Sequence, residues 1–464
     1  MTAQLEVTEP GPGPLDAPRP RRSSQRVALA AGSLAVIIAA VVIVANHQAG
    51  SPSAEPPVPG ATQSSAHPRS AATPSRLTAV RSLLRERAAA MVHHDRARFM
   101  ATIDPVATKF RRSEATMFAN TARVRFTSWS YTLGSGSLRL PTSRARHYDA
   151  PAWAPSGFAL HYRLAGFDGQ PTDLPQYPTF VDRSGRWYLA SLSGFRRRGD
   201  VSSTGLWDYA PVDVVRRGPA LVLGPGSELA TMTAVAQVVE TAIPEVTAVW
   251  GRHWARRAVV LVPSTQHEMS LVTADRGDLD QIAALTSSEV GNVRGSQAPV
   301  GDRITINPRN WPKLGPLGAN VVLAHELTHV ASRADTSAAT PKWLSEGLAE
   351  YVGFHDTDVA ATVAAAELAT DVRSGRAPTK LPRDAAFRGD NPALPQAYET
   401  SWLACRSIAT RYGQDALVRF YRAVGASAPP SAVAVNGALR RVLGISDATF
   451  TVQWRDYVRS ELVG

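Results

Sequence analysis

The feature that most constrains this chain is an apolar run near its amino terminus. Residues 27–45 hold nineteen positions without a charged side chain. As a helix with a rise of 1.5 Å per residue, the run would measure about 28 Å, close to the hydrocarbon thickness of a bilayer. Four arginines lie just before it, and the next Arg or Lys after it is Arg69. We therefore expect 27–45 to be a transmembrane helix with a cytoplasmic amino terminus.

The alternative for this run is a cleaved signal peptide. A signal peptide has an apolar region of about 7 to 15 residues that ends in a small-residue cleavage site. This run is longer and continues into Asn46, His47 and Gln48. We expect an uncleaved single-pass anchor in the cell membrane, with the remainder of the chain extracellular. Residues 1–26 are then a disordered cytoplasmic tail, and the Pro/Ser/Ala-rich residues 46–76 form a stalk.

Composition narrows the class of the remaining chain. Of 464 residues, 44% are hydrophobic and 19% are charged, which indicates globular folding in two or more domains. Cys405 is the single cysteine, so a disulfide scaffold and a cysteine zinc site are both excluded. The net charge of +11 comes from scattered arginines without interleaved aromatic residues. Nucleic acid is therefore not an expected partner.

A first domain is predicted over residues 77–200. Its apolar periodicity begins with a helix at Leu77, and short β-branched and aromatic runs follow. These runs are expected as strands over 122–126, 129–132, 159–164, 178–181 and 187–190. The order and the closing segment Asp182-Arg-Ser-Gly-Arg-Trp-Tyr-Leu189 resemble the NTF2-like family, which implies an α+β cone. Its aromatic residues are expected to form sheet core, since strands are enriched in them anyway.

The second predicted domain, residues 216–464, carries the motif with chemical content. Apolar strands are expected over 220–223, 258–263 and 302–308, and helices over 228–241 and 320–330. Within the last helix, His325, Glu326 and His329 form H-E-x-x-H. Residues i and i+4 differ by about 40° in direction on a helix, so both imidazoles converge on one point. That arrangement predicts a Zn²⁺ site, with Glu326 placed to take a proton from a water that the metal polarises.

A second acidic motif follows, and its Glu346 lies seventeen residues beyond His329. Residues 342–351 read Lys-Trp-Leu-Ser-Glu-Gly-Leu-Ala-Glu-Tyr with helical periodicity. Glu346 is the candidate third ligand, which completes a His2Glu set. Glu350, one turn on, is placed to accept the free ring N–H of a ligand histidine.

The two motifs together resemble the gluzincin metallopeptidases of the thermolysin-like and peptidase MA-like superfamily. In that family the second motif is N-E-x-x-S-D, and here Ser345 and Glu350 replace its Asn and Asp. The resemblance covers roughly 216–464 and implies a zincin-like domain with a mostly helical carboxyl-terminal half. It implies an α+β protein that hydrolyses peptide bonds with zinc as cofactor.

A competing ligand set follows metzincin spacing. In that set Asp335 would replace Glu346 as the third ligand. Ser332 stands where the metzincin turn needs a glycine, and every methionine lies at or before Met269, so no Met-turn follows the helix. We therefore assign Glu346.

The remaining catalytic roles are assigned as hypotheses. Tyr398, at the start of a probable helix after a Pro-rich loop, is the candidate stabiliser of the oxyanion. The strand near 304–307 is expected at a sheet edge, where related enzymes pair an extended substrate.

The sequence thus predicts a membrane-anchored extracytoplasmic zinc metallopeptidase that acts on a peptide or protein substrate. Two alternatives remain open: a non-catalytic surface binding or scaffold protein with a degenerate zincin domain, and a hydrolase of cell-wall peptides.

Overall fold

The computed structural model describes residues 43–44, 75–196, 199–273, 279–288 and 301–463. The predicted tail and stalk lie outside this range. So does the predicted transmembrane segment, apart from residues 43–44, which are described as strand β1 (Ile43–Val44). Within the described part of the chain, no helix is both long enough and apolar enough to cross a bilayer.

The amino-terminal unit begins with helices and continues as short antiparallel sheets. Its elements in chain order are α2 (Arg76–Val92), α3 (Arg96–Ala101), α4 (Thr108–Asn120), β2 (Phe126–Leu133), α5 (Thr142–Tyr148), β3 (Ala152–Trp153), β4 (Phe158–Leu164), β5 (Thr172–Pro175), β6 (Thr179–Arg183) and β7 (Arg186–Ser191). They form two three-stranded sheets, ordered β2-β4-β5 and β3-β6-β7. The expected strand over 122–126 is wrong, since 121–123 form a turn that ends α4 and β2 begins only at Phe126.

The second unit opens with a six-stranded sheet in the order β1-β11-β12-β10-β9-β8. Its elements are β8 (Asp213–Arg217), β9 (Ala220–Gly224), α6 (Leu229–Trp250), β10 (Ala258–Leu261), α7 (Gln266–Val272), β11 (Ala284–Ser288) and β12 (Arg303–Ile306). Strands β9, β10 and β12 are parallel to one another, whereas β11 pairs antiparallel with β12.

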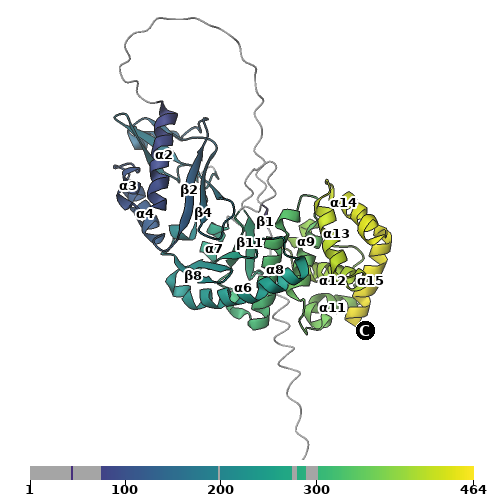
Figure 1. Cartoon of the computed structure of the whole chain (residues 1–464). Coiled ribbons are helices and arrows are strands. Elements are labelled where there is room, and N and C mark those ends of the chain that lie inside the picture. The colour runs from purple at the N-terminus through teal and green to yellow at the C-terminus, as the bar shows by residue number, and fades with distance from the viewer. Residues whose placement is uncertain (1–42, 45–74, 197–198, 274–278, 289–300, 464) are drawn as a thin grey trace, which may run out of the picture.

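Helices follow this sheet to the end of the described chain. They are α8 (Pro316–Ser332), α9 (Lys342–Gly353), α10 (Ala361–Ala364), α11 (Ala366–Arg373), α12 (Leu394–Tyr412), α13 (Gln414–Gly425), α14 (Ser431–Ala438) and α15 (Asp447–Val463). Helix α12 packs against α9, α11, α13 and α15 and is the central helix of this half (Figure 1). The fold is thus mixed α+β with a mostly helical carboxyl-terminal half, as the sequence predicts.

Two sequence expectations in this unit are corrected. Helix α6 continues through Pro244 to Trp250 instead of ending at residue 241. Its second half buries Ile243, Val246 and Val249, and this burial outweighs the backbone hydrogen bond that Pro244 cannot make. Strand β12 is not a sheet edge, because β11 pairs along its outer side.

The two units share a hydrophobic core instead of meeting through a linker. Alternate residues of β9 point to opposite faces of the sheet. Ala220 and Val222 pack with α6 and α8, whereas Leu221 and Leu223 pack with the amino-terminal unit. Phe126, Trp129 and Tyr162 of that unit are buried in this shared core, whereas Trp153, Phe158 and Phe180 pack in a separate cluster. The six-stranded sheet therefore lies between a helical layer and the amino-terminal unit.

A buried ion pair joins the two units at the same interface. Arg303 of β12 donates from both terminal nitrogens to the carboxylate of Asp168, each at 2.8 Å, and also to Thr172 at 2.8 Å. The Arg303 and Asp168 side chains are 6% and 3% exposed. Such a bidentate pair fixes orientation as well as distance, so it holds the amino-terminal unit in register with β12.

Candidate metal centre

Helix α8 presents the H-E-x-x-H motif inside the protein. The helix starts at Pro316, where a missing N–H costs nothing because the first turn has no acceptor for it. From Val321 onward every residue of the helix is buried, because the helix packs against α6, α9 and β11. His325 is fully buried and His329 is 3% exposed. A buried histidine pair one turn apart needs a polar partner, and α9 supplies it.

Helix α9 brings its two glutamates beside α8. Pro341 precedes the helix in an extended conformation, and Glu346 and Glu350 lie one turn apart on the buried side. Close packing against α12 depends on Gly347, where an added Cβ would lie 2.3 Å from the carbonyl oxygen of Ser401. The lack of a side chain at Gly347 therefore allows α9, and Glu346 with it, to lie close to α12.

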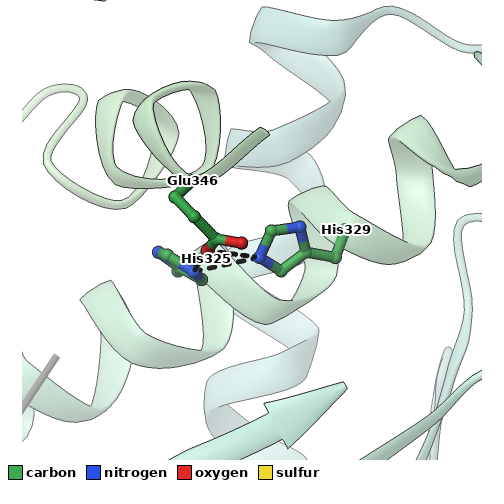
Figure 2. Close-up of side chains that lie close together, drawn as sticks. All are labelled: His325, His329 and Glu346. Atoms are coloured by element: carbon green, nitrogen blue, oxygen red, sulfur yellow. Dashed lines mark hydrogen bonds and ion pairs between the residues drawn. The ribbon is translucent and has the colours of Figure 1, made fainter. Parts of the chain in front are cut away.

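The side chains of His325, His329 and Glu346 converge on one point from two helices (Figure 2). The two histidine Nε2 atoms are 3.0 Å apart, and Oε2 of Glu346 lies 3.4 Å from each of them. Three ligands about 2.0 to 2.1 Å from one tetrahedral zinc ion would be separated by about 3.3 to 3.4 Å. The triangle therefore has the size and the donor types of a His2Glu zinc site.

The pKa values in this cluster are set by burial and by the close contacts among the charged groups. Burial lowers the pKa of both imidazoles. In His329 burial prevails and the pKa falls to about 4, whereas the nearby carboxylates of Glu346 and Glu350 outweigh burial in His325 and raise its pKa to about 10. Burial would raise the pKa of Glu346, but the two imidazoles prevail and hold it at about 2. Glu346 is thus ionised and offers its carboxylate oxygens beside the two imidazoles.

Glu350 contacts the other side of a ligand histidine. Its Oε1 lies 3.3 Å from Nδ1 of His325, on the ring edge opposite Nε2. Burial raises the pKa of Glu350, against the lowering effect of His325. A carboxylate at Nδ1 orients the ring so that Nε2 points at the metal position.

Glu326 lies beside the cluster without joining it. It is fully buried, and its Oε2 accepts a hydrogen bond of 2.5 Å from the hydroxyl of Thr286. Its Oε1 has no hydrogen-bond partner among the described residues. Burial raises the pKa of Glu326 to about 7, although His325 and the Thr286 hydroxyl both lower it. A carboxyl group with a free oxygen and a pKa near neutrality suits proton transfer.

Tyr398 reaches the same cluster from α12. Its ring centroid lies 6.1 Å from that of His325, and its hydroxyl is buried without a hydrogen-bond partner in the described part of the chain. Burial, together with Glu346, Glu350 and Glu326, raises the pKa of the hydroxyl well above its usual value near 10. The hydroxyl therefore stays protonated and can donate a hydrogen bond, which no described residue accepts.

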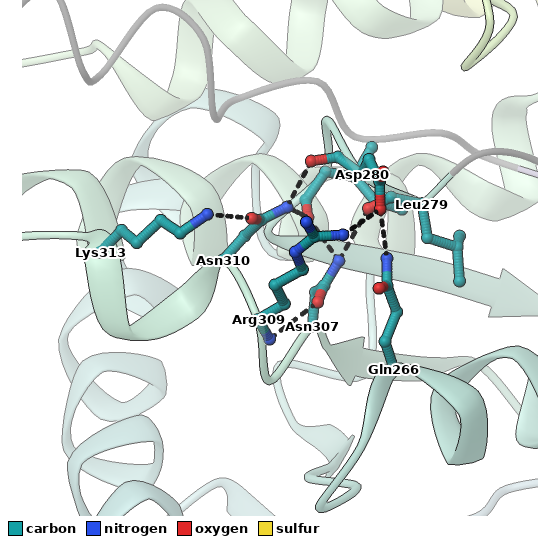
Figure 3. A network of polar contacts seen from close by, with 8 residues as sticks. Gln266, Leu279, Asp280, Asn307, Arg309, Asn310 and Lys313 are labelled. Atoms are coloured by element: carbon teal, nitrogen blue, oxygen red, sulfur yellow. Dashed lines mark hydrogen bonds and ion pairs between the residues drawn. The ribbon is translucent and has the colours of Figure 1, made fainter.

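The entry to β11 is held by two buried asparagines that follow β12 (Figure 3). Asn307 donates to the carbonyl oxygens of Leu279 and Ile282, each at 2.8 Å. Asn310 donates to the carbonyl oxygens of Asp280 and Ile282 at 2.8 and 2.7 Å. These bonds fix the segment that leads into β11, and thereby the strand that carries Thr286.

Most of the site residues predicted from the sequence lie close together in the structure, and one candidate does not. It brings His325, His329 and Glu346 together, with Glu326, Glu350 and Tyr398 beside them. It does not bring in Asp335, which pairs with Arg422 at 3.4 Å on another helix.

Sequence reasoning missed Thr286 and the whole of β11. Ala284 to Ser288 is a five-residue stretch with one β-branched residue, which is too weak a signal for a strand.

Comparison with known proteins gives only distant similarity. No protein-family model matches the chain, and no curated protein does. Among solved structures, a two-domain M1 zinc metallopeptidase bound to L-arginine is 15% identical, with a TM-score of 0.30 over 61% of this chain and 60% of that one. An M1 zinc metallopeptidase from Deinococcus radiodurans, bound to a Tyr-Ser-Ala substrate, is 13% identical, with a TM-score of 0.30 over 72% of this chain and 61% of that one.

The chain thus spans about 60% of the length of these structures. A likeness at this TM-score does not extend to the whole fold.

Proposed function

We propose that this protein is a zinc-dependent metallopeptidase whose site is formed by α8, α9 and α12. The observation that carries the proposal is the triangle of His325, His329 and Glu346, because its edges of 3.0, 3.4 and 3.4 Å match tetrahedral zinc coordination. Zinc, when bound there, supplies Lewis acidity toward a water molecule and a peptide carbonyl.

The neighbouring side chains supply the remaining steps of peptide hydrolysis. Glu326 takes the proton of the attacking water at its free Oε1 and passes it to the leaving amine. The unpartnered hydroxyl of Tyr398 donates a hydrogen bond to the oxyanion that develops on the carbonyl. Glu350 holds the His325 ring in the orientation that directs Nε2 inward.

Burial of the cluster supports catalysis over a purely structural metal site. Glu326 takes no part in the ligand triangle, yet it is fully buried with one oxygen unpaired, and the Tyr398 hydroxyl is also buried and unpaired. Each unpaired buried polar group costs about 1 to 3 kcal/mol of folding free energy. A structural site gains nothing from that cost, whereas a catalytic site uses both groups on a bound substrate.

The surrounding assignments belong to the same proposal and rest on the sequence. The apolar run 27–45 would anchor the chain in the cell membrane with the peptidase outside, and the substrate would be an extracytoplasmic peptide or protein. The amino-terminal unit would be an NTF2-like module. Two features support this module: the helix-first order and the antiparallel pairing of β6 with β7. The core that the unit shares with β9 and β10 supports a role beside the peptidase.

The test compares the full chain with Glu326→Gln and Glu346→Ala. Metal content is measured by plasma mass spectrometry after zinc is offered, and cleavage is followed on a mixed peptide library by mass spectrometry. We expect about one zinc per chain in the wild type and in Glu326→Gln, loss of zinc in Glu346→Ala, and peptide cleavage by the wild type alone. A wild type that binds zinc but cleaves no peptide would favour the scaffold alternative.

A further inference from the structure

Thr286 is a buried polar residue that the catalytic motifs do not include. It lies in the middle of β11, where it pairs with Ile304 of β12. Its side chain is fully buried. Most buried hydroxyl groups have a hydrogen-bond partner, and the partner of Thr286 belongs to α8.

The partner of Thr286 is the residue proposed to act as the base. The hydroxyl donates to Oε2 of Glu326 at 2.5 Å and lies 3.2 Å from the carbonyl oxygen of the same residue. Since a hydroxyl has one hydrogen, the short contact to the carboxylate is the stronger bond. The other carboxylate oxygen, Oε1, has no partner within the described residues. One oxygen of Glu326 is therefore held and the other is left free.

This asymmetry has a direct consequence for orientation. A glutamate side chain turns about three single bonds, and a fully buried carboxylate with no fixed donor would move toward the nearest positive charge. The ligand histidine His325 lies next to Glu326 in the chain and is also buried. The Thr286 hydroxyl holds Oε2 of the carboxylate at β11. Proton transfer depends on such placement to within about 0.5 Å.

The position of Thr286 is itself well defined. β11 pairs with β12 over four residues, from Ala284 with Ile306 to Ser287 with Arg303. The segment before β11 is held by Asn307 and Asn310 (Figure 3). The strand is thus a rigid support for the hydroxyl, which is what the positioning of a catalytic group requires.

We propose that Thr286 is a positioning residue that holds the Glu326 carboxylate by one oxygen, so that the other is free to accept the proton of the attacking water. The inference rests on the proposed peptidase function and deepens it. It predicts that the hydroxyl, and not the methyl group or the bulk of Thr286, contributes to turnover.

A matched pair of substitutions tests this role. Thr286→Val removes the hydroxyl and keeps the shape of the side chain. Thr305→Val does the same on the adjacent strand, where Thr305 is fully buried and its hydroxyl has no hydrogen-bond partner among the described residues. We expect Thr286→Val to lower kcat about ten- to a hundredfold, with KM and zinc content within twofold of wild type. Thr305→Val should leave all three unchanged.

Thr286→Ser is the rescue variant, because it keeps the hydroxyl and loses the methyl group. It should retain kcat within about threefold of wild type. If Thr286→Val loses its zinc, Thr286→Ser decides alone: retained turnover supports the proposal, and a loss of tenfold or more with zinc bound would overturn it. A second readout is Thr286→Val in the Glu326→Ala background, where a residue that acts only through Glu326 causes no further loss of residual activity.

The outcomes separate the two proposals. Wild-type cleavage that depends on Glu326, together with unchanged kcat in Thr286→Val, would refute the role of Thr286 and leave the peptidase proposal intact. If the zinc-loaded wild type has no peptidase activity, Glu326 does not act as a base. The proposed role of Thr286 is then refuted together with the peptidase proposal. Equal losses of kcat in Thr286→Val and Thr305→Val would assign the effect to general packing and would also refute the inference.

Discussion

Glu350 lies one turn of α9 beyond Glu346 and contacts the same histidine from the other side: its Oε1 is 3.3 Å from Nδ1 of His325, whereas Oε2 of Glu346 is 3.4 Å from Nε2. One helix thus provides both a candidate ligand and the group that orients its partner. The i and i+4 spacing of the two glutamates on α9 places them along one face of the helix.

Removal of the Glu350 carboxylate should weaken metal binding without abolishing it. Without an acceptor at Nδ1, the His325 ring loses its fixed orientation, and such outer partners contribute about ten- to a hundredfold in metal affinity. We expect this loss in Glu350→Ala, measured by zinc competition with a chromogenic chelator. Glu350→Gln keeps an acceptor at this position and should lose less. Unchanged affinity in Glu350→Ala would show that the contact has no orienting role.

Replacement of Tyr398 should affect turnover and leave the metal in place. Its hydroxyl has no partner in the described structure, so Tyr398→Phe breaks no hydrogen bond in the resting protein. We expect kcat to fall about 10²- to 10³-fold, as for the loss of one oxyanion donor, with zinc content and melting temperature unchanged. Kinetics equal to those of wild type would exclude Tyr398 as the oxyanion stabiliser.

Gly347 should tolerate no side chain. An added Cβ would lie 2.3 Å from the carbonyl oxygen of Ser401 and 2.9 Å from Sγ of Cys405, so Gly347→Ala must push α9 away from α12. We expect a destabilisation of about 1 to 3 kcal/mol and weaker zinc binding, because Glu346 moves with the helix. Chemical denaturation measures the first and metal analysis the second.

Gly437→Ala is the control for this change. Gly437 lies in helix α14 with open space where the Cβ would be. The substitution there should be neutral or stabilise by about 0.5 to 1 kcal/mol. A Gly347→Ala protein as stable as Gly437→Ala would contradict the close packing of α9 on α12.

Glu399 should make stability depend on pH. Its carboxyl group accepts the backbone N–H groups of Glu367 and Leu368 at 3.3 and 2.6 Å, at the start of α11. Burial, and then the neighbouring Glu367 side chain, raises the pKa of Glu399 to about 10. An unfolded glutamate ionises near pH 4.3, so the folded state alone keeps the proton above that value.

The stability that this proton gives is complete below about pH 4 and is lost as the pH rises toward 10. Glu399→Gln, which stays neutral, should flatten this dependence. We expect the melting temperature of the wild type to fall more than that of Glu399→Gln between pH 6 and 9, measured by scanning calorimetry. Parallel curves for the two proteins would mean that Glu399 is already ionised at pH 6.

Local periodicity was enough to predict the elements that carry the ligands. The spacing of His325 and His329 requires a helix for convergence, and the apolar pattern of 320–330 provides one. The pattern of 342–351 likewise predicts α9 with Glu346 and Glu350 on one face. The structure extends both helices, to Pro316–Ser332 and Lys342–Gly353. Burial of Val352 and Gly353 accounts for the longer end of α9, whereas the start of α8 is exposed at Pro316, a residue that suits the first turn of a helix.

Contacts between segments far apart in the chain could not be predicted in this way. Motif comparison favoured Glu346 over Asp335, but the distances within the cluster depend on how α9 packs against α8. The expectation of an edge strand near 304–307 failed because β11, a short stretch with little apolar character, pairs along that side. The ion pair of Arg303 with Asp168 joins residues 135 positions apart, and neither residue has a sequence signal that names its partner.

The sequence by itself therefore determined the chemistry that is available: two histidines and two glutamates at helical spacing, with Glu326 between the histidines as the proposed base. Tertiary structure decided which side chains lie beside these groups: Thr286 contacts Glu326, Glu350 contacts His325, and the Tyr398 ring lies near that of His325. The reason is physical. Helical geometry is set by bonds within a few residues, whereas the placement of a buried side chain is set by whichever distant segment packs against it.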